Sequence, residues 1–458
     1  MTASRATRSV CPVCLRSLPS EFVVRGDEVW LRRECPEHGE AAALVWRGAP
    51  GFEAWRDAGS GSCCGEAAGN PACPSACGLC EGHATPTCCL LLEVTQRCDL
   101  ACPVCFAAAS PEAPADPSIG TIEGWYRRLL DVAPGCNVQL SGGEPTLRDD
   151  LPEVIALGRR LGHGFLQLNT NGLRLAAEAG YAEQLAGAGL ATVFLQFDGV
   201  DDEPYRALRG RPLAAVKERA VRRCAEAGLG VVLVPTVARG VNLDRLGDIL
   251  SFALEHAPAV RGVHVQPLAL LGRAPDAADP GAARVTLPDV MRALVDQSGG
   301  RLRLEDLTPG DCEHALCSFS REYLRGEDGV LRPLGAAGGS CGCGAPAADP
   351  VRDVAPAAKA AHVAARWTAP TAARATGCCG GPKEPTDQWD AILEGLHAAA
   401  FSVSGMAFQD AWTLDLDRLR HCYLHVLAAD GRVVPFCSRY LTAVPGSAGA
   451  ASPACAAP

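Results

Sequence analysis

Short apolar runs alternate with longer amphipathic segments between residues 90 and 270 of the chain. Apolar runs bounded by turn residues predict strands, and apolar residues that recur every three to four positions predict helices. The predicted strands are residues 90–95, 137–140, 165–168, 192–197, 230–237 and 263–267. The predicted helices lie between them, at residues 121–132, 151–161, 176–188, 213–227 and 243–256.

Strands that alternate with helices predict a parallel sheet on which the helices pack. A closed β/α barrel has eight such units, and this pattern supplies six strands. The predicted fold class is therefore α/β, with an open, partial (β/α)6 barrel over residues 90–298 as the core.

A smaller unit precedes this core. Residues 1–57 contain a predicted hairpin that turns at Gly26-Asp27, with a C-x2-C pair before it and a C-x2-H pair after it. Two such pairs joined by a hairpin are typical of a zinc- or iron-binding ribbon with a closed, structural site. The expected ligands are Cys11, Cys14, Cys35 and His38.

The remaining segments are rich in cysteine and show little periodicity. Residues 58–89 predict a Cys-rich segment held by an auxiliary metal site, either a second cluster or a mononuclear iron. Residues 299–445 predict a C-terminal Cys-rich region, and the low-complexity tail at residues 446–458 is expected to be disordered.

Composition limits the classes of partner. The net charge is −10, and no run of Lys and Arg is longer than three residues, which disfavours a nucleic-acid partner. No apolar run approaches the ~18 residues of a membrane span, and the N-terminus has no apolar signal core. We therefore expect a cytoplasmic protein. In that reducing compartment, 24 cysteines predict metal ligands or redox thiols rather than disulfides.

Three of these cysteines, Cys98, Cys102 and Cys105, form a C-x3-C-x2-C motif directly after the first predicted strand of the core. A [4Fe–4S] cluster held by three cysteines keeps one iron without a protein ligand, so the motif predicts chemistry. The alternative to a catalytic cluster is a structural zinc knuckle or a chance grouping of cysteines. Residues 73–80 repeat the same spacing, but no strand precedes them, and this context favours the later motif.

Polar and glycine residues follow successive predicted strands of the core. The second strand runs into Ser141-Gly142-Gly143-Glu144-Pro145, where two glycines let the backbone approach a ligand closely. The carboxyl ends of parallel strands form the ligand site of such folds. The side chains expected there on the later strands are Asn169, Asn171, Gln196, Asp198 and Gln266.

The cysteine motif and the Gly-Gly-Glu-Pro turn together resemble the radical S-adenosylmethionine (SAM) superfamily. The resemblance implies that Cys98, Cys102 and Cys105 hold the catalytic cluster and that its open iron binds SAM. Reductive cleavage of SAM would then give a 5′-deoxyadenosyl radical for C–H activation. The implied SAM-binding residues are Phe106, Ser141, Gly142, Gly143, Glu144, Pro145, Asn169, Asn171, Gln196, Asp198 and Gln266.

The flanking motifs resemble one branch of this superfamily, which includes a pterin methyltransferase and the archaeal tetraether lipid synthase. That branch is similar in carrying extra iron–sulfur clusters and a rubredoxin-like metal site. The implied auxiliary ligands are Cys73, Cys77, Cys80 and Cys88 before the core and Cys312, Cys317, Cys422 and Cys437 after it. The chain departs from the lipid synthase pattern at Cys63, Cys64, Cys341, Cys343, Cys378 and Cys379. At these positions it resembles a subgroup of radical SAM (seleno)proteins. The paired cysteines either take part in redox chemistry or lie in loops without a chemical role.

The resemblance leaves the reaction open. Methyl transfer or C–C bond formation on a small-molecule, lipid or pterin-like substrate fits the branch, with flavodoxin or ferredoxin as electron donor. Peptide or protein maturation is the alternative enzyme class. A non-enzymatic iron–sulfur redox protein is the alternative outside catalysis, and the turn at Gly142–Pro145 argues against it, because a redox protein needs no SAM pocket.

Overall fold

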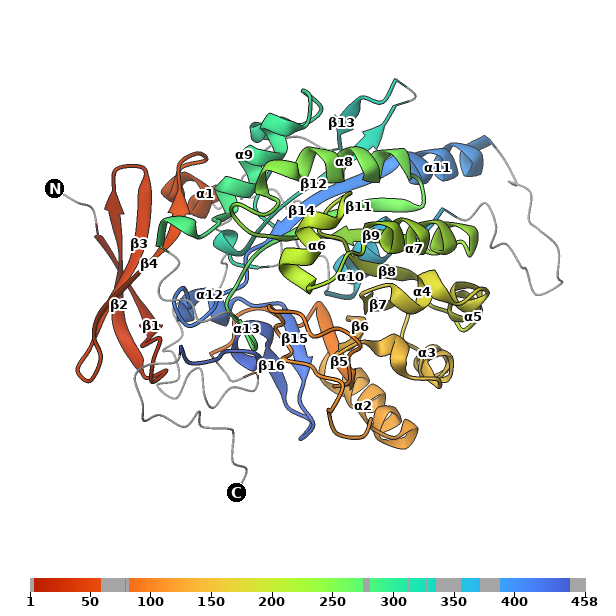
Figure 1. Cartoon of the computed structure of the whole chain (residues 1–458), viewed down its shortest axis with the longest axis horizontal. Coiled ribbons are helices and arrows are strands. Elements are labelled where there is room, and N and C mark those ends of the chain that lie inside the picture. Colours follow the sequence, from red (N-terminus) through yellow and green to blue (C-terminus); the bar gives the residue numbers. More distant parts are fainter. Residues whose placement is uncertain are drawn as a thin grey trace, which may run out of the picture.

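The computed structural model describes residues 4–58, 79, 82–274, 281–310, 313–326, 328–334, 356–370 and 388–444. The N-terminal unit is a separate four-stranded antiparallel sheet, at the left in Figure 1. It has four strands where the apolar pattern predicted one hairpin, because two outer strands flank that hairpin. The elements are β1 (Ser4–Val10), β2 (Ser17–Arg25), β3 (Glu28–Cys35), β4 (Gly39–Arg47) and helix α1 (Phe52–Ala58).

All six predicted core strands are present and pair in parallel in the order β11-β9-β8-β7-β6-β5. Their bounds are β5 (Cys89–Thr95), β6 (Asn137–Gly142), β7 (Leu166–Thr170), β8 (Thr192–Gln196), β9 (Gly230–Val234) and β11 (Val260–Pro267). The strand predicted at residues 230–237 is divided at Pro235, which cannot donate a ladder hydrogen bond, and continues as β10 (Thr236–Val237).

Helices connect these strands and cover one face of the sheet. Two short helices occupy the segment predicted as one helix at 176–188, and α6 was not predicted. The bounds are α2 (Ile119–Val132), η1 (Pro145–Leu147), α3 (Leu151–Arg160), α4 (Leu173–Ala177), α5 (Tyr181–Gly187), α6 (Asp202–Arg209), α7 (Ala214–Glu226), η2 (Leu243–Arg245) and α8 (Leu246–Glu255).

The C-terminal part of the chain adds a parallel strand to each edge of this sheet. Strand β14 (Ala400–Met406) pairs with β11, and β15 (Leu424–Leu427) pairs with β5. The described residues therefore contain eight parallel strands where six were predicted. Antiparallel partners extend both edges, namely β12 (Ser318–Arg325), β13 (Leu331–Pro333) and β16 (Val433–Pro435). Helices α12 (Leu416–Arg420) and α13 (Phe436–Arg439) lie near β15 (Figure 1).

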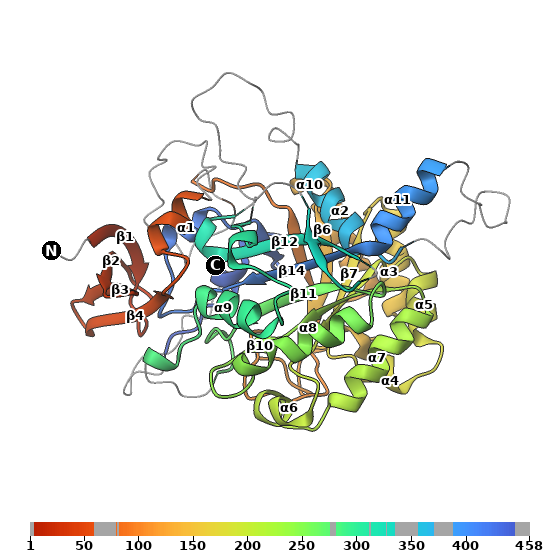
Figure 2. The same cartoon turned by 90° about the horizontal axis from the view of Figure 1, so that it is seen from above.

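Helix α10 (Pro356–Trp367) packs at the amino ends of the central strands, where Thr192 Oγ1 donates to the carbonyl of Trp367 (2.9 Å). Residues 335–385 are rich in Ala, Gly and Pro, a composition that predicts mostly loop, so a helix at residues 356–367 was not expected. The other helices are α9 (Leu287–Gln297) and α11 (Gln388–Ala399), with single turns η3 (Gly281–Ala283), η4 (Leu304–Asp306) and η5 (Ala315–Cys317) (Figure 2).

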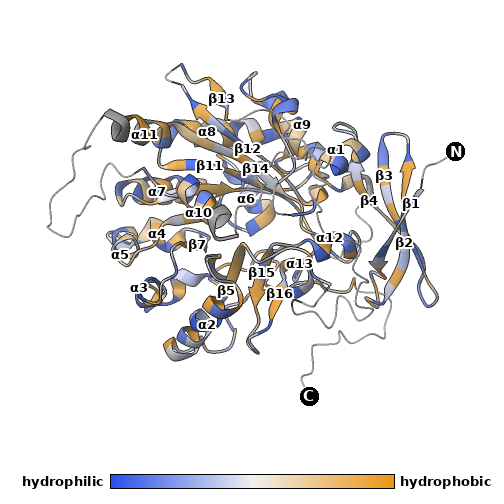
Figure 3. Cartoon of the chain, turned by 180° about the vertical axis from the view of Figure 1, so that it is seen from behind, coloured by the Kyte–Doolittle hydropathy of each residue, from blue (hydrophilic) through white to orange (hydrophobic). Residues whose placement is uncertain are grey.

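The main core lies between the sheet and the outer helices. Alternate strand residues such as Leu140, Leu168 and Leu195 have no exposed surface and pack with helix residues such as Tyr126 and Ile249. In Figure 3 strands such as β5 and β15 carry mainly hydrophobic colours. None of the helices that the structure describes is long and apolar enough to cross a membrane.

Candidate active site

The cysteine loop follows β5 at the carboxyl edge of the sheet. Cys102 is buried and packs with Cys98 and Cys105. Arg273, in the loop after β11, exchanges backbone hydrogen bonds with Cys105 (2.7 and 2.9 Å), and its side chain donates to the carbonyl of Cys102 (2.8 Å). Burial raises the pKa of the Cys98 thiol to about 12. The three thiols that the motif predicts as ligands are therefore held together on one anchored loop.

The Gly142–Gly143 turn packs directly on the backbone that leads into the cysteine loop. A Cβ atom on Gly142 would lie 2.0 Å from the carbonyl oxygen of Thr95, and one on Gly143 would lie 2.1 Å from that of Arg97. The amides of Gly143 and Glu144 donate to these two carbonyls, at 2.8 and 2.7 Å. Only glycine fits such a close approach, so the turn and the cysteine loop form one unit.

The Glu144 carboxylate is buried and acts as a brace. It accepts hydrogen bonds from Thr146 Oγ1 (2.6 Å), Thr170 Oγ1 (2.7 Å) and the backbone N–H of Asn171 (2.6 Å). Burial raises the pKa of this carboxyl group, and these hydrogen bonds oppose the rise. The brace joins the Gly-Gly turn to the end of β7.

We expect Glu144→Ala to lower the stability of the protein by about 2–4 kcal/mol, because it leaves buried donors on Thr146, Thr170 and Asn171 unsatisfied. The check is the chemical unfolding midpoint under anaerobic conditions, together with the Kd for SAM, which should rise. Glu153→Ala, on the exposed face of α3, is the matched control and should change neither. Equal unfolding midpoints for the two variants would show that Glu144 does not stabilise the contact between the Gly-Gly turn and the end of β7.

The strand-end amides occupy two different environments. Asn171 Nδ2 donates to Asp99 Oδ1 (2.7 Å) and so ties the end of β7 to the cysteine loop. Asn169 points along the inner face of the sheet, where its Nδ2 donates to Gln139 Oε1 (3.0 Å). The structure thus places Asn171, but not Asn169, in direct contact with the cysteine loop.

Asp198, two residues after β8, forms a buried ion pair with Arg209 that sequence reasoning missed. Its carboxylate accepts from Arg209 Nε (2.7 Å) and Nη2 (3.0 Å), from the backbone N–H of Thr236 (3.0 Å) and from Gln196 Nε2. The positive charge of Arg209 also acts on the Cys102 thiol. Burial raises the pKa of that thiol, and the guanidinium charge opposes the rise. A buried cation beside the motif fits an anionic iron–sulfur site.

Lys217 on α7 is a second missed residue. It has no exposed surface, and its ammonium donates to the carbonyl of Asn171 (2.5 Å) and to Gln196 Oε1 (2.7 Å). Burial lowers the pKa of this amine to about 7. Its position on an amphipathic helix gave no signal, since lysine on such a helix normally faces solvent.

The remaining predicted SAM-binding residues lie around the same edge. Ser141 and Pro145 are buried, whereas Gln266 is half-buried at the end of β11. Phe106, 36% exposed, lies with its ring centroid 4.9 Å from that of Tyr440 and 5.3 Å from that of Phe436. The cysteine loop therefore contacts the C-terminal part of the chain through Phe106.

The ribbon brings its four predicted ligands together. Their ligand atoms all lie within 4.8 Å of one another, and His38 Nδ1 lies 3.6 Å from Cys11 Sγ and 3.4 Å from Cys35 Sγ. Burial raises the pKa of Cys35, but hydrogen bonds from the Glu37 backbone and from His38 outweigh it and lower that pKa to about 6. Three cysteine sulfurs, which bind metal as thiolates, and one imidazole are a donor set that zinc ribbons use.

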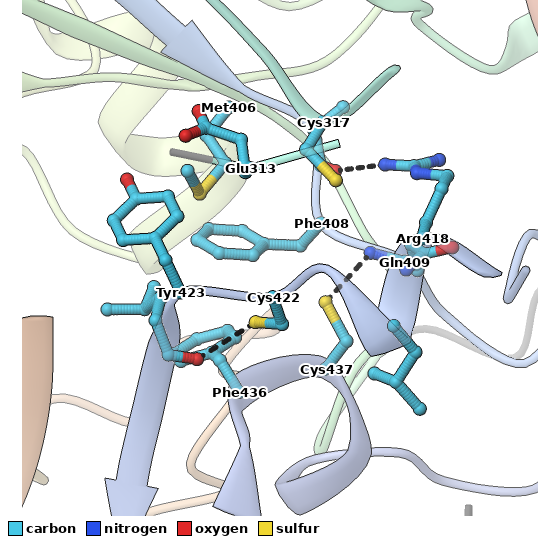
Figure 4. A pocket seen from close by; sticks show the side chains of 13 residues that line it. Glu313, Cys317, Met406, Phe408, Gln409, Arg418, Cys422, Tyr423, Phe436 and Cys437 are labelled. Atoms are coloured by element: carbon cyan, nitrogen blue, oxygen red, sulfur yellow. Dashed lines mark hydrogen bonds between the residues drawn. The ribbon is translucent and has the colours of Figure 1, made fainter. Parts of the chain in front are cut away.

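A second cysteine cluster lines a small pocket near β15 (Figure 4). Cys317, Cys422 and Cys437 point into it, and the Arg418 guanidinium donates to the carbonyl of Ala407 (3.0 Å) beside them. The Cys437 thiol accepts from the backbone N–H of Gln409 (3.3 Å), and burial raises its pKa to about 12. These are three of the predicted C-terminal ligands.

Cys88 is buried directly before β5, and its amide donates to the carbonyl of Tyr423 (3.2 Å), the residue that follows Cys422. The other predicted ligands and the paired cysteines lie outside the described residues. They are Cys73, Cys77, Cys80 and Cys312, with Cys63, Cys64, Cys341, Cys343, Cys378 and Cys379.

Comparison with known proteins agrees with this site. Residues 92–253 match the model of the radical SAM superfamily, and residues 3–47 match that of the HMPTM N-terminal zinc ribbon domain. The chain is 30% identical to the 7,8-dihydro-6-hydroxymethylpterin dimethyltransferase of Methanocaldococcus jannaschii, over 95% of this chain and 93% of that protein. The chain therefore belongs to the radical SAM superfamily, in the family of this dimethyltransferase.

Other relatives match the core over a shorter stretch. Identity is 27% to a probable GTP 3′,8-cyclase of Methanothermobacter thermautotrophicus, over 55% of this chain and 86% of that protein. It is 34% to a PqqA peptide cyclase of Streptomyces rochei, over 36% of this chain and 44% of that protein. The predicted α/β fold with an N-terminal ribbon is confirmed, and the protein is a radical SAM enzyme. The superfamily uses a [4Fe–4S] cluster and SAM.

Proposed function

We propose that the protein binds SAM at a [4Fe–4S] cluster held by Cys98, Cys102 and Cys105 and activates a C–H bond of a pterin or pterin-like substrate. The observation that carries this proposal is the Gly142–Glu144 turn, which packs on the backbone before the cysteine loop at the carboxyl edge of a parallel sheet. A structural zinc knuckle requires no such turn.

The protein's own residues bind and orient the reactants. The Gly142–Pro145 turn, Asn171 and Gln196 border the expected SAM site. Arg209 offsets the negative charge of a cluster bound to three thiolates, and Glu144 with Lys217 holds the strand ends in place. With a cluster on Cys98, Cys102 and Cys105, with SAM bound, and with flavodoxin or ferredoxin as electron donor, the site would supply a 5′-deoxyadenosyl radical for C–H activation.

The similarity to the dimethyltransferase spans 95% of the chain, and it supports methyl transfer over C–C bond formation. The similarity to the peptide cyclase covers about a third of the chain and supports only a shared core. In this proposal Cys317, Cys422 and Cys437 hold an auxiliary iron–sulfur cluster, and the ribbon holds zinc or a single iron.

The test is anaerobic reconstitution with iron and sulfide, followed by dithionite, SAM and 7,8-dihydro-6-hydroxymethylpterin. We expect 5′-deoxyadenosine, and a loss of at least about a hundredfold in 5′-deoxyadenosine with Cys102→Ala, because a cluster ligand is gone. Cys77→Ala is the matched control from the motif of identical spacing, and it should retain SAM cleavage. If the wild type forms no 5′-deoxyadenosine, the proposal is refuted. If SAM cleavage is lost with Cys77→Ala but not with Cys102→Ala, the SAM-binding cluster lies at the earlier motif and our assignment is wrong.

A further inference from the structure

The inner face of the sheet, opposite the outer helices, is incompletely buried. Strand residues alternate between the two faces, and those on the helix side, such as Leu140 and Leu168, have no exposed surface. Their neighbours on the inner face are half-buried although the strands are central. They are Gln139, Asn169, Gln196, Val234, His264 and Gln266. Partial exposure in the middle of a sheet marks a solvent-accessible space along this face.

One wall of this space is a chain of carboxamides on β6 and β7. Gln167 Nε2 donates to Asn169 Oδ1 (3.0 Å), and Asn169 Nδ2 donates to Gln139 Oε1 (3.0 Å) and lies 3.4 Å from Ser141 Oγ. Each amide fixes the orientation of the next. The wall therefore presents preorganised, uncharged hydrogen-bonding groups.

His264 on β11 lies further along the same inner face, beyond β8 and β9. Its Nδ1 lies 2.9 Å from Ser404 Oγ on β14, and the two residues are register partners in the sheet. The bond leaves Nε2 as the ring nitrogen available to a ligand. Burial lowers the pKa of His264 to about 4, so the imidazole is neutral near pH 7 and can donate or accept a hydrogen bond.

Aromatic rings lie near His264. The Phe194 ring centroid is 5.8 Å from that of His264 and 4.8 Å from that of Trp367 on α10. The positive charge of Arg366 also lowers the pKa of His264, but the Arg366 guanidinium forms an ion pair with Glu322 (2.9 Å). Amides, hydroxyls, a neutral imidazole and aromatic rings suit a flat, uncharged ligand with polar edges, whereas a triphosphate requires free cations.

We infer that the space between Asn169 and His264 binds an uncharged, planar nitrogen heterocycle, and that His264, positioned by Ser404, is the contact that selects it. The inference rests on the proposed function and specifies where the substrate ring lies. It also separates this chain from its nucleotide-cyclising relatives, because a nucleotide brings a charged phosphate chain.

The test measures binding of 6-hydroxymethylpterin to the anaerobically reconstituted, SAM-loaded enzyme by fluorescence titration, with GTP as the charged probe. We expect His264→Ala to raise the Kd for the pterin at least about tenfold and Ser404→Ala to raise it about threefold to tenfold, with partial rescue in His264→Gln. GTP should bind at least about tenfold more weakly than the pterin. His256→Ala, a histidine on the outer helix α8, is the matched control and should bind normally.

Iron content and circular dichroism show whether each variant is folded, and Ser404→Ala provides a milder second variant. The inference is overturned if His264→Ala and Ser404→Ala both bind the pterin as the wild type does, if GTP binds as tightly, or if the wild type binds no pterin. SAM cleavage by the wild type without pterin is measured separately. Absence of 5′-deoxyadenosine there refutes the proposed function, whereas cleavage without His264-dependent binding refutes only this inference.

Discussion

Asp198→Asn is expected to destabilise the protein by about 3–5 kcal/mol and to abolish SAM cleavage. The reason is that Asp198 forms an ion pair with Arg209 away from water. The Asp198 side chain has no exposed surface, and the Arg209 side chain is 9% exposed. Removing one charge of a buried ion pair leaves the other without compensation in a medium of low polarity. The guanidinium left without its partner is the one whose charge acts on the Cys102 thiol, so the cluster site is disturbed together with the fold.

The measurements are the urea unfolding midpoint and the rate of 5′-deoxyadenosine formation, both on anaerobically reconstituted protein. Asp201→Asn is the matched control, because Asp201 lies three residues further along, and its ion pair with Arg245 is half exposed. That change should cost less than about 1 kcal/mol. A double variant with Arg209→Met should recover part of the stability lost in Asp198→Asn. A cost below about 1 kcal/mol for Asp198→Asn would show that the pair does not support the site.

Sequence periodicity predicted the six central strands because each is an apolar run next to an amphipathic helix in the chain. It missed β14 and β15, since a strand added from the distant C-terminal part looks like any other short apolar run. Nothing local shows that residues 400–406 lie beside β11 and residues 424–427 beside β5. Pairing across more than a hundred residues is a property of the tertiary structure.

The same distinction holds for the site. Motif spacing located Cys98, Cys102, Cys105 and the Gly142–Pro145 turn, because these residues are neighbours in sequence. Motif spacing did not identify Arg209 and Lys217 as site residues, because each lies on a helix where a basic residue normally faces solvent. Their burial depends on partners from other strands, such as Asp198 and the carbonyl of Asn171.

The three C-terminal cysteines come from both edges of the sheet. Cys317 directly precedes β12, whose first residue pairs with the last residue of β14, whereas Cys422 precedes β15 and Cys437 follows β16. A cluster held by all three would link the strand added at one edge to the strand added at the other. The ring of Phe436, next to Cys437, also contacts Phe106 of the cysteine loop.

Cys437→Ala is therefore expected to remove one cluster, about four iron atoms per chain for a [4Fe–4S] cluster, and to speed amide hydrogen exchange in β14 and β15 by about tenfold or more. SAM cleavage should fall but persist, because Cys98, Cys102 and Cys105 remain. The measurements are iron content, exchange by mass spectrometry and 5′-deoxyadenosine formation.

Cys224→Ala is the matched control for Cys437→Ala, since Cys224 is a fully buried cysteine on α7 that lies in the core between sheet and helices. It should lose no iron, and exchange in β14 and β15 should match the wild type. If Cys437→Ala also keeps its full iron content, the C-terminal cysteines hold no cluster. If it loses iron but the exchange of both strands is unchanged, the cluster is bound there without linking the two edges, and the apolar contacts of Leu91, Met406 and Val426 alone hold the barrel together.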